Sequence, residues 1–350
     1  MRKQNGIILI LLLLLTFFFT DQAISQGKKN NNITIGFYNV ENLFDTIDDP
    51  VTDDQEFTPS GSGKWDSGRY KIKLEHLAEA IFVIGNEQMT GAPVMVGLAE
   101  VENKQVVEDL VSTPPLAKMG YKIIHYDSPD KRGIDVALIY RSSLFKVTGS
   151  KAIPLRIEDK PDFFTRDILQ VSGTLDGQPL VIMVNHWPSR TKGEKESAPL
   201  RNAAGDLCRS LFDSIQKEKP GTAVIIMGDF NDDPINESLM DHLKTIVMQD
   251  SLKKRDLFNP MWALFEDGVG SLAYKGKWNL FDQIIISSSL MEKGNKRYQF
   301  YKAGVLKSKM LLEQEGQYAG YPFRSYAGST YLGGYSDHLP AFISLVRNPK

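Results

Sequence analysis

Two short motifs in the second half of the chain carry residue types suited to acid–base and phosphate chemistry. Residues 227–231 read Met-Gly-Asp-Phe-Asn, which puts Asp229 and Asn231 two residues apart after an apolar run. A carboxylate at Asp229 can orient or deprotonate a water molecule, and the carboxamide of Asn231 can donate to a phosphate oxygen without adding charge. The plainer interpretation is a turn that ends a strand, since Asp, Asn and Gly favour turns.

The second motif, residues 336–340, reads Ser-Asp-His-Leu-Pro and precedes another apolar run. Asp337 is a hard oxygen ligand of the kind that suits Mg²⁺, Ca²⁺ or Mn²⁺. His338 titrates near neutral pH and can act as an acid or a base. Here too a plainer interpretation exists, namely a capped loop before a strand.

Further polar residues stand singly at the ends of predicted strands. Asn39, Glu100 and His186 each follow an apolar run, whereas Asp135 and Asp282 each precede one. Taken alone, Asn39 is explained by an Asx turn, Glu100 by a solvated loop and His186 by a packed core position. Asp282 is different, because an acid that enters a buried strand needs a partner, and a histidine suits it.

Two arginines complete the set. Arg132 directly precedes the segment Gly-Ile-Asp-Val at 133–136, and Arg166 lies in the segment Phe-Thr-Arg-Asp at 164–167. Arginine suits bidentate contact with phosphate. Each of the two, taken singly, is also explained by a surface ion pair.

The elements that must position these residues follow from the apolar pattern. Short runs rich in β-branched residues predict buried strands, and 3.6-residue spacing predicts helices. The predicted strands are 93–98, 135–140, 180–184, 223–227, 283–286 and 341–346. The predicted helices are 69–84 and 200–216, and residues 45–67 form a long loop rich in Asp, Pro, Gly and Ser. The apolar residues near helical spacing in the first helix are Ile72, Leu74, Leu77, Ala80, Ile81 and Ile84.

In an antiparallel or mixed sheet, the end of one strand lies beside the start of its neighbour. The polar residues that follow strands and those that precede strands can therefore gather on one rim of the sheets. Two such sheets, packed face to face with helices outside, account for this number of buried runs.

The order of these pieces resembles the endonuclease/exonuclease/phosphatase family. The matching pieces are, in sequence order, Asn39, Glu100, Asp135, His186, Asp229 with Asn231, Asp282, and Asp337 with His338. The resemblance runs from about residue 33 to 346, and residues 228–231 and 336–338 are its most specific parts. It implies an α/β/β/α four-layer sandwich of two mostly antiparallel, mixed sheets, and cleavage of a phosphate ester by an in-line water.

The resemblance also implies a metal site and a catalytic set. Glu100 would be the main metal ligand, helped by Asn39 and Asp337, with Glu41 where some members have an aspartate. Asp229 would orient the attacking water, Asn231 would hold a phosphoryl oxygen, and His338 would act at the phosphate, paired with Asp282. His186 resembles a second histidine of the extracellular nuclease branch, and we expect it to face the phosphate and to be held by Asp135.

For substrate binding we expect Arg132, Asp135, Arg166 and Asn231. One departure from the family pattern concerns Arg132. Members that cleave nucleic acid often place a tyrosine near the start of the strand 135–140, and this chain has Arg132 in roughly that place.

The N-terminus predicts export. Arg2 and Lys3 precede an apolar run at 7–19, and Ala-Ile-Ser at 23–25 provides small residues for a signal peptidase. The run is short for a membrane span, which needs about 20 residues. We expect a signal peptide at 1–25, a polar tail at 26–32 and a catalytic domain at 33–348, in a secreted or periplasmic protein without stable membrane insertion. Cys208, the single cysteine, is expected to be a buried thiol.

The substrate is less determined than the reaction. A net charge of −2 on 350 residues does not suggest a polyanion partner held by charge alone. The first hypothesis is nonetheless an endonuclease on DNA or RNA, supported by export and by loop aromatics that could stack on bases: Trp65, Trp187 and Trp262. The second is a phosphatase or phospholipase-type phosphodiesterase on sugar phosphates, inositol phosphates or lipid head groups, and the third is a binding module without catalysis.

Carboxylate, amide and water ligands favour Mg²⁺ or Mn²⁺, with Ca²⁺ as a further candidate. Zinc prefers nitrogen and sulfur, and the chain has 5 histidines and 1 cysteine. We therefore expect a hard divalent cation, and a monomeric enzyme.

Overall fold

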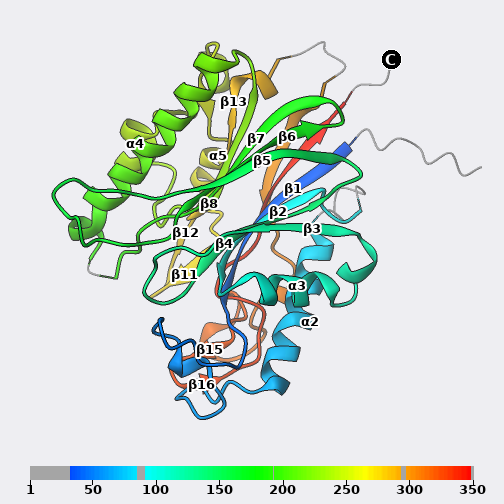
Figure 1. The fold of residues 1–350 in the computed structure, drawn as a ribbon, viewed down its shortest axis with the longest axis vertical. Helices are drawn as coiled ribbons and strands as arrows, with labels where there is room; N and C mark the ends of the chain where they lie inside the picture. The colour runs from blue at the N-terminus through cyan, green and yellow to red at the C-terminus, as the bar shows by residue number, and fades with distance from the viewer. Residues whose placement is uncertain (1–31, 85–90, 192, 293–296, 348–350) are drawn as a thin grey trace, which may run out of the picture. The chain divides into compact units, whose positions relative to one another are not determined.

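The computed structural model describes residues 32–84, 91–191, 193–292 and 297–347 (Figure 1). The predicted signal peptide lies outside these residues. So does the predicted polar tail, apart from Asn32, which begins the first strand. Within the described residues, no helix is both long and apolar enough to cross a membrane.

One sheet has six strands within the described residues, in the order β14-β17-β1-β2-β4-β3. Its central strand β1 runs parallel to β2 and antiparallel to β17. The bounds are β1 Asn32–Leu43, β2 Met95–Val101, β3 Tyr121–His125, β4 Asp135–Arg141, β14 Gln299–Val305 and β17 Ala341–Val346. Asn32 pairs with Val346, so the first and last described strands lie together inside the sheet.

The second sheet has seven strands in the described part of the chain, in the order β5-β6-β7-β8-β13-β10-β9. Strands β7 and β8 are parallel, and the other pairs that flank them are antiparallel. The bounds are β5 Phe145–Ile153, β6 Ile168–Leu175, β7 Gln178–His186, β8 Ala223–Asp229, β9 Thr245–Ile246, β10 Leu257–Phe258 and β13 Asp282–Ser287. Both sheets are therefore mixed, as expected.

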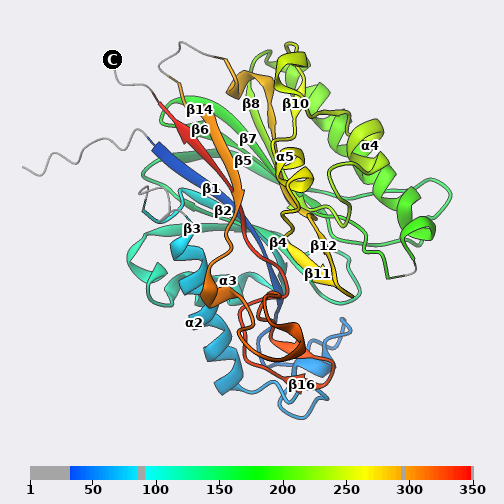
Figure 2. The ribbon, with the colours of Figure 1, turned by 180° about the vertical axis from the view of Figure 1, so that it is seen from behind.

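Three hydrophobic clusters hold the layers together. The largest lies between the two sheets and includes Ile35, Leu138, Ile182 and Met227. A second packs α2 (Ser67–Val83) and α3 (Lys104–Ser112) on the outer face of the first sheet. A third packs α4 (Glu194–Glu218) on the outer face of the second sheet. The layer order is helix, sheet, sheet, helix, which confirms the four-layer sandwich (Figures 1 and 2).

The predicted helices differ from the observed ones in detail. Helix α2 begins at Ser67 because the Asp66 side chain accepts a hydrogen bond from the Arg69 backbone N–H. Of the apolar residues near helical spacing, Ile72 is 40% exposed, whereas Lys73 beside it is buried. Helix α3 was not predicted, although Asn103 caps it and Val106, Val107 and Leu110 form its buried face.

Smaller elements lie between these strands. They include α5 (Met261–Glu266), the hairpin of β11 (Leu272–Tyr274) with β12 (Lys277–Asn279), and the hairpin of β15 (Tyr326–Ala327) with β16 (Thr330–Tyr331). The predicted loop at 45–67 contains a single 3-10 turn, Gln55–Phe57. Cys208 in α4 is a buried free thiol, as expected, and donates to the Asn185 amide oxygen at 3.1 Å.

Strand register brings the polar residues to one rim. His186 pairs with Asp229 at the shared carboxyl ends of β7 and β8, and Asp229 pairs with Asp282 at the start of antiparallel β13. On the first sheet, Asn39 pairs with Ala99, next to Glu100. The expectation that strand ends and strand starts meet on one rim is therefore confirmed for these residues.

Candidate active site

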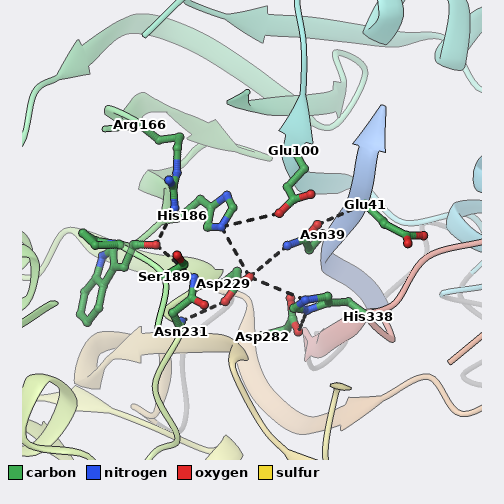
Figure 3. A network of polar contacts seen from close by, with 12 residues as sticks. Asn39, Glu41, Glu100, Arg166, His186, Ser189, Asp229, Asn231, Asp282 and His338 are labelled. Atoms are coloured by element: carbon green, nitrogen blue, oxygen red, sulfur yellow. Dashed lines mark hydrogen bonds and ion pairs between the residues drawn. The ribbon is translucent and has the colours of Figure 1, made fainter. Parts of the chain in front are cut away.

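Asp229 lies at the centre of the polar network (Figure 3). Its Oδ2 accepts a hydrogen bond from the Asn39 amide of the opposite sheet at 2.9 Å. Its Oδ1 accepts from the Asn231 backbone N–H at 2.9 Å. Burial raises the pKa of Asp229 to about 6, and the His338 imidazole opposes this rise. A buried carboxylate with one oxygen turned toward two histidines is suited to accept a proton.

His338 and Asp282 form a close pair. The Nδ1 of His338 lies 2.6 Å from Asp282 Oδ2, and its Nε2 lies 3.9 Å from Asp229 Oδ2. Burial alone lowers the pKa of His338, but the Asp282 carboxylate outweighs burial and holds the pKa well above its ordinary value. The predicted pairing of His338 with Asp282 is confirmed, and it directs Nε2 toward the centre of the site.

His186 lies on the other side of Asp229. Its Nε2 is 3.7 Å from Asp229 Oδ2 and 3.9 Å from Glu100 Oε1. Burial lowers the pKa of His186 well below the ordinary value, and the nearby Arg166 and Arg132 guanidinium groups add to the effect. A neutral imidazole therefore faces the two carboxylates, while its Nδ1 has no hydrogen-bond partner among the described residues.

The prediction that Asp135 holds His186 is wrong. Asp135 Oδ2 lies 3.1 Å from His125 Nε2, and its Oδ1 accepts from the Ser128 backbone N–H at 2.9 Å. Both carboxylate oxygens are therefore occupied, and the competing partner His125, at the end of β3, was not recognised from the sequence. Asp135 orders the loop between β3 and β4 rather than the site.

Glu100 reaches the site through a backbone irregularity. The pairing of β2 with both neighbours shifts register around this residue, and its φ is 65°, in the left-handed region. Such bulges turn a side chain away from the regular alternation and are frequent next to active sites. The Glu100 carboxylate accepts from the Asn42 backbone N–H at 3.0 Å and lies 3.8 Å from Arg132.

Glu41 is a buried acid held by a buried base. Its Oε2 accepts from the Ser325 backbone N–H at 2.7 Å and lies 3.6 Å from Lys73 Nζ. Burial, with the nearby Asp337, raises the pKa of Glu41 to about 7, although Lys73 opposes this. Asp337 is partly exposed and lies 3.9 Å from both Arg324 and His338 Nε2.

Lys73 was missed in the sequence. It donates to the Ser325 hydroxyl and the Tyr335 carbonyl, each at 2.7 Å. The helical spacing that placed Leu77 and Ala80 on the buried face of α2 also places Lys73 there, four residues before Leu77. That spacing indicated that a buried cation lies beneath the acids at the rim.

Asn231 and Arg166 share one acceptor. The Asn231 amide donates to the Trp187 carbonyl at 3.0 Å, and Arg166 donates to the same carbonyl at 2.6 Å. Arg166 also pairs with Asp130 at 3.1 Å. The predicted substrate ligands therefore lie against the site, with Arg166 largely buried.

Arg132 lies at the edge of the site. Its side chain is 48% exposed and donates to the Asn42 amide oxygen. This exposed cation lies beside Glu100, and its role in phosphate binding stays a prediction.

The predicted stacking aromatics are largely unavailable to a substrate. Trp65 is 1% and Trp187 is 2% exposed, and each indole N–H is satisfied internally, by the Phe44 carbonyl and the Asn185 amide oxygen respectively. The expectation that both lie exposed in loops is wrong. Trp262 lies in α5 and is partly buried.

The site fits a hard divalent cation by charge and by donor type. The carboxylates of Glu41, Glu100 and Asp337 all lie near a single buried base, Lys73. Mutual repulsion between Glu41 and Asp337 leaves an excess of negative charge that a cation would offset. Oxygen donors of carboxylate and amide type suit such an ion.

The predicted metal ligands are of suitable chemical types, but their ligand atoms do not all lie close to one another. In the described part of the chain, three acid or histidine ligand atoms lie within 4.8 Å of one another in two groups only, Asp229 with Asp282 and His338, and His125 with Asp127 and Asp135. Glu41, Glu100 and Asp337 therefore do not all converge to that distance. Glu100 and Asn39 stand side by side facing the centre (Figure 3).

Comparison with known proteins gives one family and one fold. The model of the endonuclease/exonuclease/phosphatase family matches residues 34–347. No curated protein matches the chain in sequence.

Solved structures share the fold at low identity. TDP2 from D. rerio, complexed with a single-strand DNA product, is 16% identical, with 90% of this chain and 98% of that chain covered and a TM-score of 0.53. A mannosyl-6-phosphatase from Bacteroides thetaiotaomicron VPI-5482 is 16% identical, with 90% and 99% covered and a TM-score of 0.53. The human Nocturnin catalytic domain with bound sulfate is 19% identical, with 91% and 96% covered and a TM-score of 0.51.

Proposed function

Because the chain belongs to the endonuclease/exonuclease/phosphatase family, and is thereby a hydrolase of phosphate esters, we propose that it attacks small phosphate esters outside the cytoplasm. The observation that carries this proposal is the joint placement of Asp229, His186 and His338 on one rim. Asp229 Oδ2 lies 3.7 Å from one imidazole and 3.9 Å from the other. A phosphate group that approaches this rim meets a base and two imidazoles together.

Each of these groups has a role that its contacts support. Asp229 is fixed through both oxygens, so it can orient a water molecule and take its proton. His338, with Nδ1 fixed by Asp282, presents an N–H at Nε2 to the developing charge on the phosphate. Neutral His186 can hold a phosphoryl oxygen or the water, and Asn231 adds a neutral donor beside it.

The metal proposal rests on Glu100, Asn39, Asp337 and Glu41 as holders of Mg²⁺ or Mn²⁺. A divalent cation bound there supplies positive charge that offsets the negative charge of the transition state. The chain's own residues orient that site: the backbone N–H of Glu41 donates to the Asn39 amide oxygen, and that of Asn42 donates to Glu100, each at 3.0 Å.

Small esters are favoured over nucleic acid by the surface around the site. Stacking of bases needs exposed aromatic faces, and Trp65 and Trp187 are buried. The net charge of −2 provides no general attraction for a polyanion. Nucleic acid, predicted first from the sequence, remains the second candidate, and the likeness to a TDP2 complexed with single-strand DNA supports it.

The activity is tested with a substrate panel. Sugar phosphates, inositol phosphates, sphingomyelin, single-stranded DNA, plasmid DNA and RNA are incubated with Mg²⁺ or Mn²⁺, with and without EDTA. We expect chelator-sensitive phosphate release from small esters, and loss of that release in Asp229→Asn. Hydrolysis of nucleic acid alone would support the second candidate, and activity equal in Asp229→Asn would contradict the proposed centre.

Export is a separate part of the proposal, supported by the apolar run at 7–19 and the small residues at 23–25. We expect the mature chain to begin near Gln26. N-terminal sequencing of protein recovered outside the inner membrane tests this, and an intact Met1 would contradict it.

A further inference from the structure

A cavity of about 380 Å³ opens next to the proposed metal ligands, a volume within the range of ligand pockets. Its lining comes from two segments, one with Glu41, Asn42, Glu56, Phe57, Ser62, Gly63 and Trp65, the other with Ser325, Tyr326, Gly328 and Ser329. The roles described above use only Glu41, Asn42 and Ser325 of this set, the last through its hydrogen bond to Glu41. The other lining residues have no part in the attack on phosphorus.

The cavity adjoins the site at two residues of its lining, Glu41 and Asn42. The N–H of Glu41 contacts Asn39, and the N–H of Asn42 contacts Glu100. Both residues have positive φ, 50° and 54°, so the chain turns sharply where the site ends and the cavity begins. Figure 3 shows Glu41 across Asn39 from His186. Glu41 and Asn42 thus border the cavity and also hold Asn39 and Glu100 of the site.

The walls are built and held in place. The Phe57 ring stacks on Phe44 at a centroid distance of 4.3 Å, and the Trp65 indole donates to the Phe44 carbonyl at 3.0 Å. The Tyr326 hydroxyl donates to the Gly63 carbonyl at 2.9 Å and so ties the two segments together. In both ribbon views the hairpin of β15 and β16 lies against the early loop at this end of the molecule (Figures 1 and 2).

The charged groups of the lining disfavour an anion. The described lining contains two carboxylates, Glu41 and Glu56, and neither lysine nor arginine. Lys73, beneath Ser325, is already engaged with Glu41 and two oxygens. Arg132 and Arg69 reach the wall through hydrogen bonds to the Asn42 amide oxygen and the Gly63 carbonyl, so the charged groups of the lining itself are the two carboxylates, which disfavour a phosphate or sulfate group.

The same walls suit a ring that carries hydroxyl groups. The partly exposed aromatic rings of Phe57 and Tyr326 offer apolar surface, while the carboxylate of Glu56 and the hydroxyls of Ser62 and Ser329 offer acceptors and donors. A quaternary ammonium would use the rings and the acids but leave the serines without partners. A sugar ring uses all three kinds of group.

We propose that this cavity is the subsite for the sugar ring of a monosaccharide phosphate whose phosphate is cleaved at Asp229. This inference rests on the proposed function, because it names the substrate class of the same site. Glu56 binds ring hydroxyls, the aromatic walls pack on the ring, and the phosphate lies outside the cavity between Glu100 and Asp229.

The test compares two substrates and two ligands across three variants. The substrates are hexose 6-phosphate and propyl phosphate, which lacks a ring; the ligands are their non-hydrolysable phosphonate analogues, measured by calorimetry. Glu56→Gln removes the charged acceptor, and Ser62→Trp fills the cavity from an exposed loop position. Asp53→Asn removes the same charge from the same loop outside the cavity and serves as the matched control.

We expect both cavity variants to lower the ratio of kcat/KM for hexose 6-phosphate to that for propyl phosphate by roughly tenfold or more, the loss typical of a hydrogen bond to a charged group. The preference for the hexose phosphonate should fall in parallel, and Asp53→Asn should keep the wild-type ratio. Ratios unchanged in both cavity variants would overturn the subsite. A third outcome separates the two proposals. If the wild-type protein hydrolyses no ester but still prefers the hexose phosphonate, and the cavity variants lose this preference, the proposed function fails and the subsite stands.

Discussion

Asp229 joins the two sheets through its side chain. One carboxylate oxygen accepts from Asn39 of the first sheet, and the backbone of Asp229 pairs with His186 and Asp282 of the second. The site is thus divided between two separately hydrogen-bonded layers. A substitution of Asp229 that keeps the side-chain volume tests its catalytic role.

Asp229→Asn is nearly isosteric, so we expect it to keep the fold and to lower kcat by roughly 10²–10⁴-fold, the range for a positioned acid–base group. His338→Ala should give a comparable loss, and the double variant should lose less than the product of the two because both residues act in one step. Turnover measurements give the change in kcat, and far-ultraviolet circular dichroism shows whether the fold is kept. A folded Asp229→Asn protein with near wild-type turnover would place the base elsewhere.

Glu100→Gln removes the charge of the expected main metal ligand and keeps its size. We expect the Mg²⁺ concentration for half-maximal activity to rise at least tenfold, because a neutral amide binds a hard cation less strongly than a carboxylate does. Titration of activity with Mg²⁺ measures this. The exposed Glu108→Gln, in an i,i+4 pair with Lys104, is the control, and an equal shift in both variants would contradict the assignment.

At the scale of elements, β7, β8 and β13 were predicted closely because each is a continuous apolar run buried along its length. Strand β5 and strand β14 were not, because they are half-exposed and interrupt the apolar pattern with Lys and Ser or Lys and Gly. The gathering of polar residues at strand ends followed from this pattern. The bulge at Glu100 and the pairing of Asp135 with His125 could not be predicted from this pattern, because both depend on which strands lie side by side in the folded sheet.

Helix α4 is fixed to the loop after β8 by a buried ion pair, which sequence spacing does not reveal. Arg201 is 0% exposed and lies 2.8 Å from Asp232, one residue after Asn231. The pair therefore links the outer helix layer to the segment that positions Asn231.

Arg201→Ala leaves Asp232 with a weakened set of buried partners, and we expect it to lower the free energy of unfolding by roughly 3–5 kcal/mol. Arg209→Ala on the same helix breaks a more exposed i,i+4 pair with Asp213 and should cost less than about 1 kcal/mol. Urea denaturation followed by circular dichroism compares the two. Equal losses would show that the Arg201 pair contributes no more than a surface pair.

For the whole molecule, the distance between the sheets sets the geometry of the site. Gly97 in β2 faces the second sheet, and a Cβ there would lie 2.6 Å from Met227 Sδ and 3.0 Å from a Val184 methyl group. The close approach of the sheets at this point requires glycine, since no smaller side chain exists.

Gly97→Ala should overpack this contact, lower the free energy of unfolding by roughly 1–3 kcal/mol and reduce kcat, because Glu100 and Asp229 move apart with the sheets. Gly149→Ala, in a strand where a Cβ meets nothing within 4 Å, is the matched control and should change neither property. Thermal denaturation and turnover measured on the same preparations test both. Lost stability with unchanged kcat would show that the site tolerates movement between the layers.

The pairing of β1 with β17 has a consequence for how the protein is made. β1 is among the first strands of the described chain to leave the ribosome, yet one of its two neighbours, β17, is among the last, and His338 emerges only shortly before it. A nascent or prematurely terminated chain therefore lacks both the middle of a sheet and an imidazole of the site. The hydrolase should therefore have no activity until both His338 and β17 have been synthesised and β17 has paired with β1.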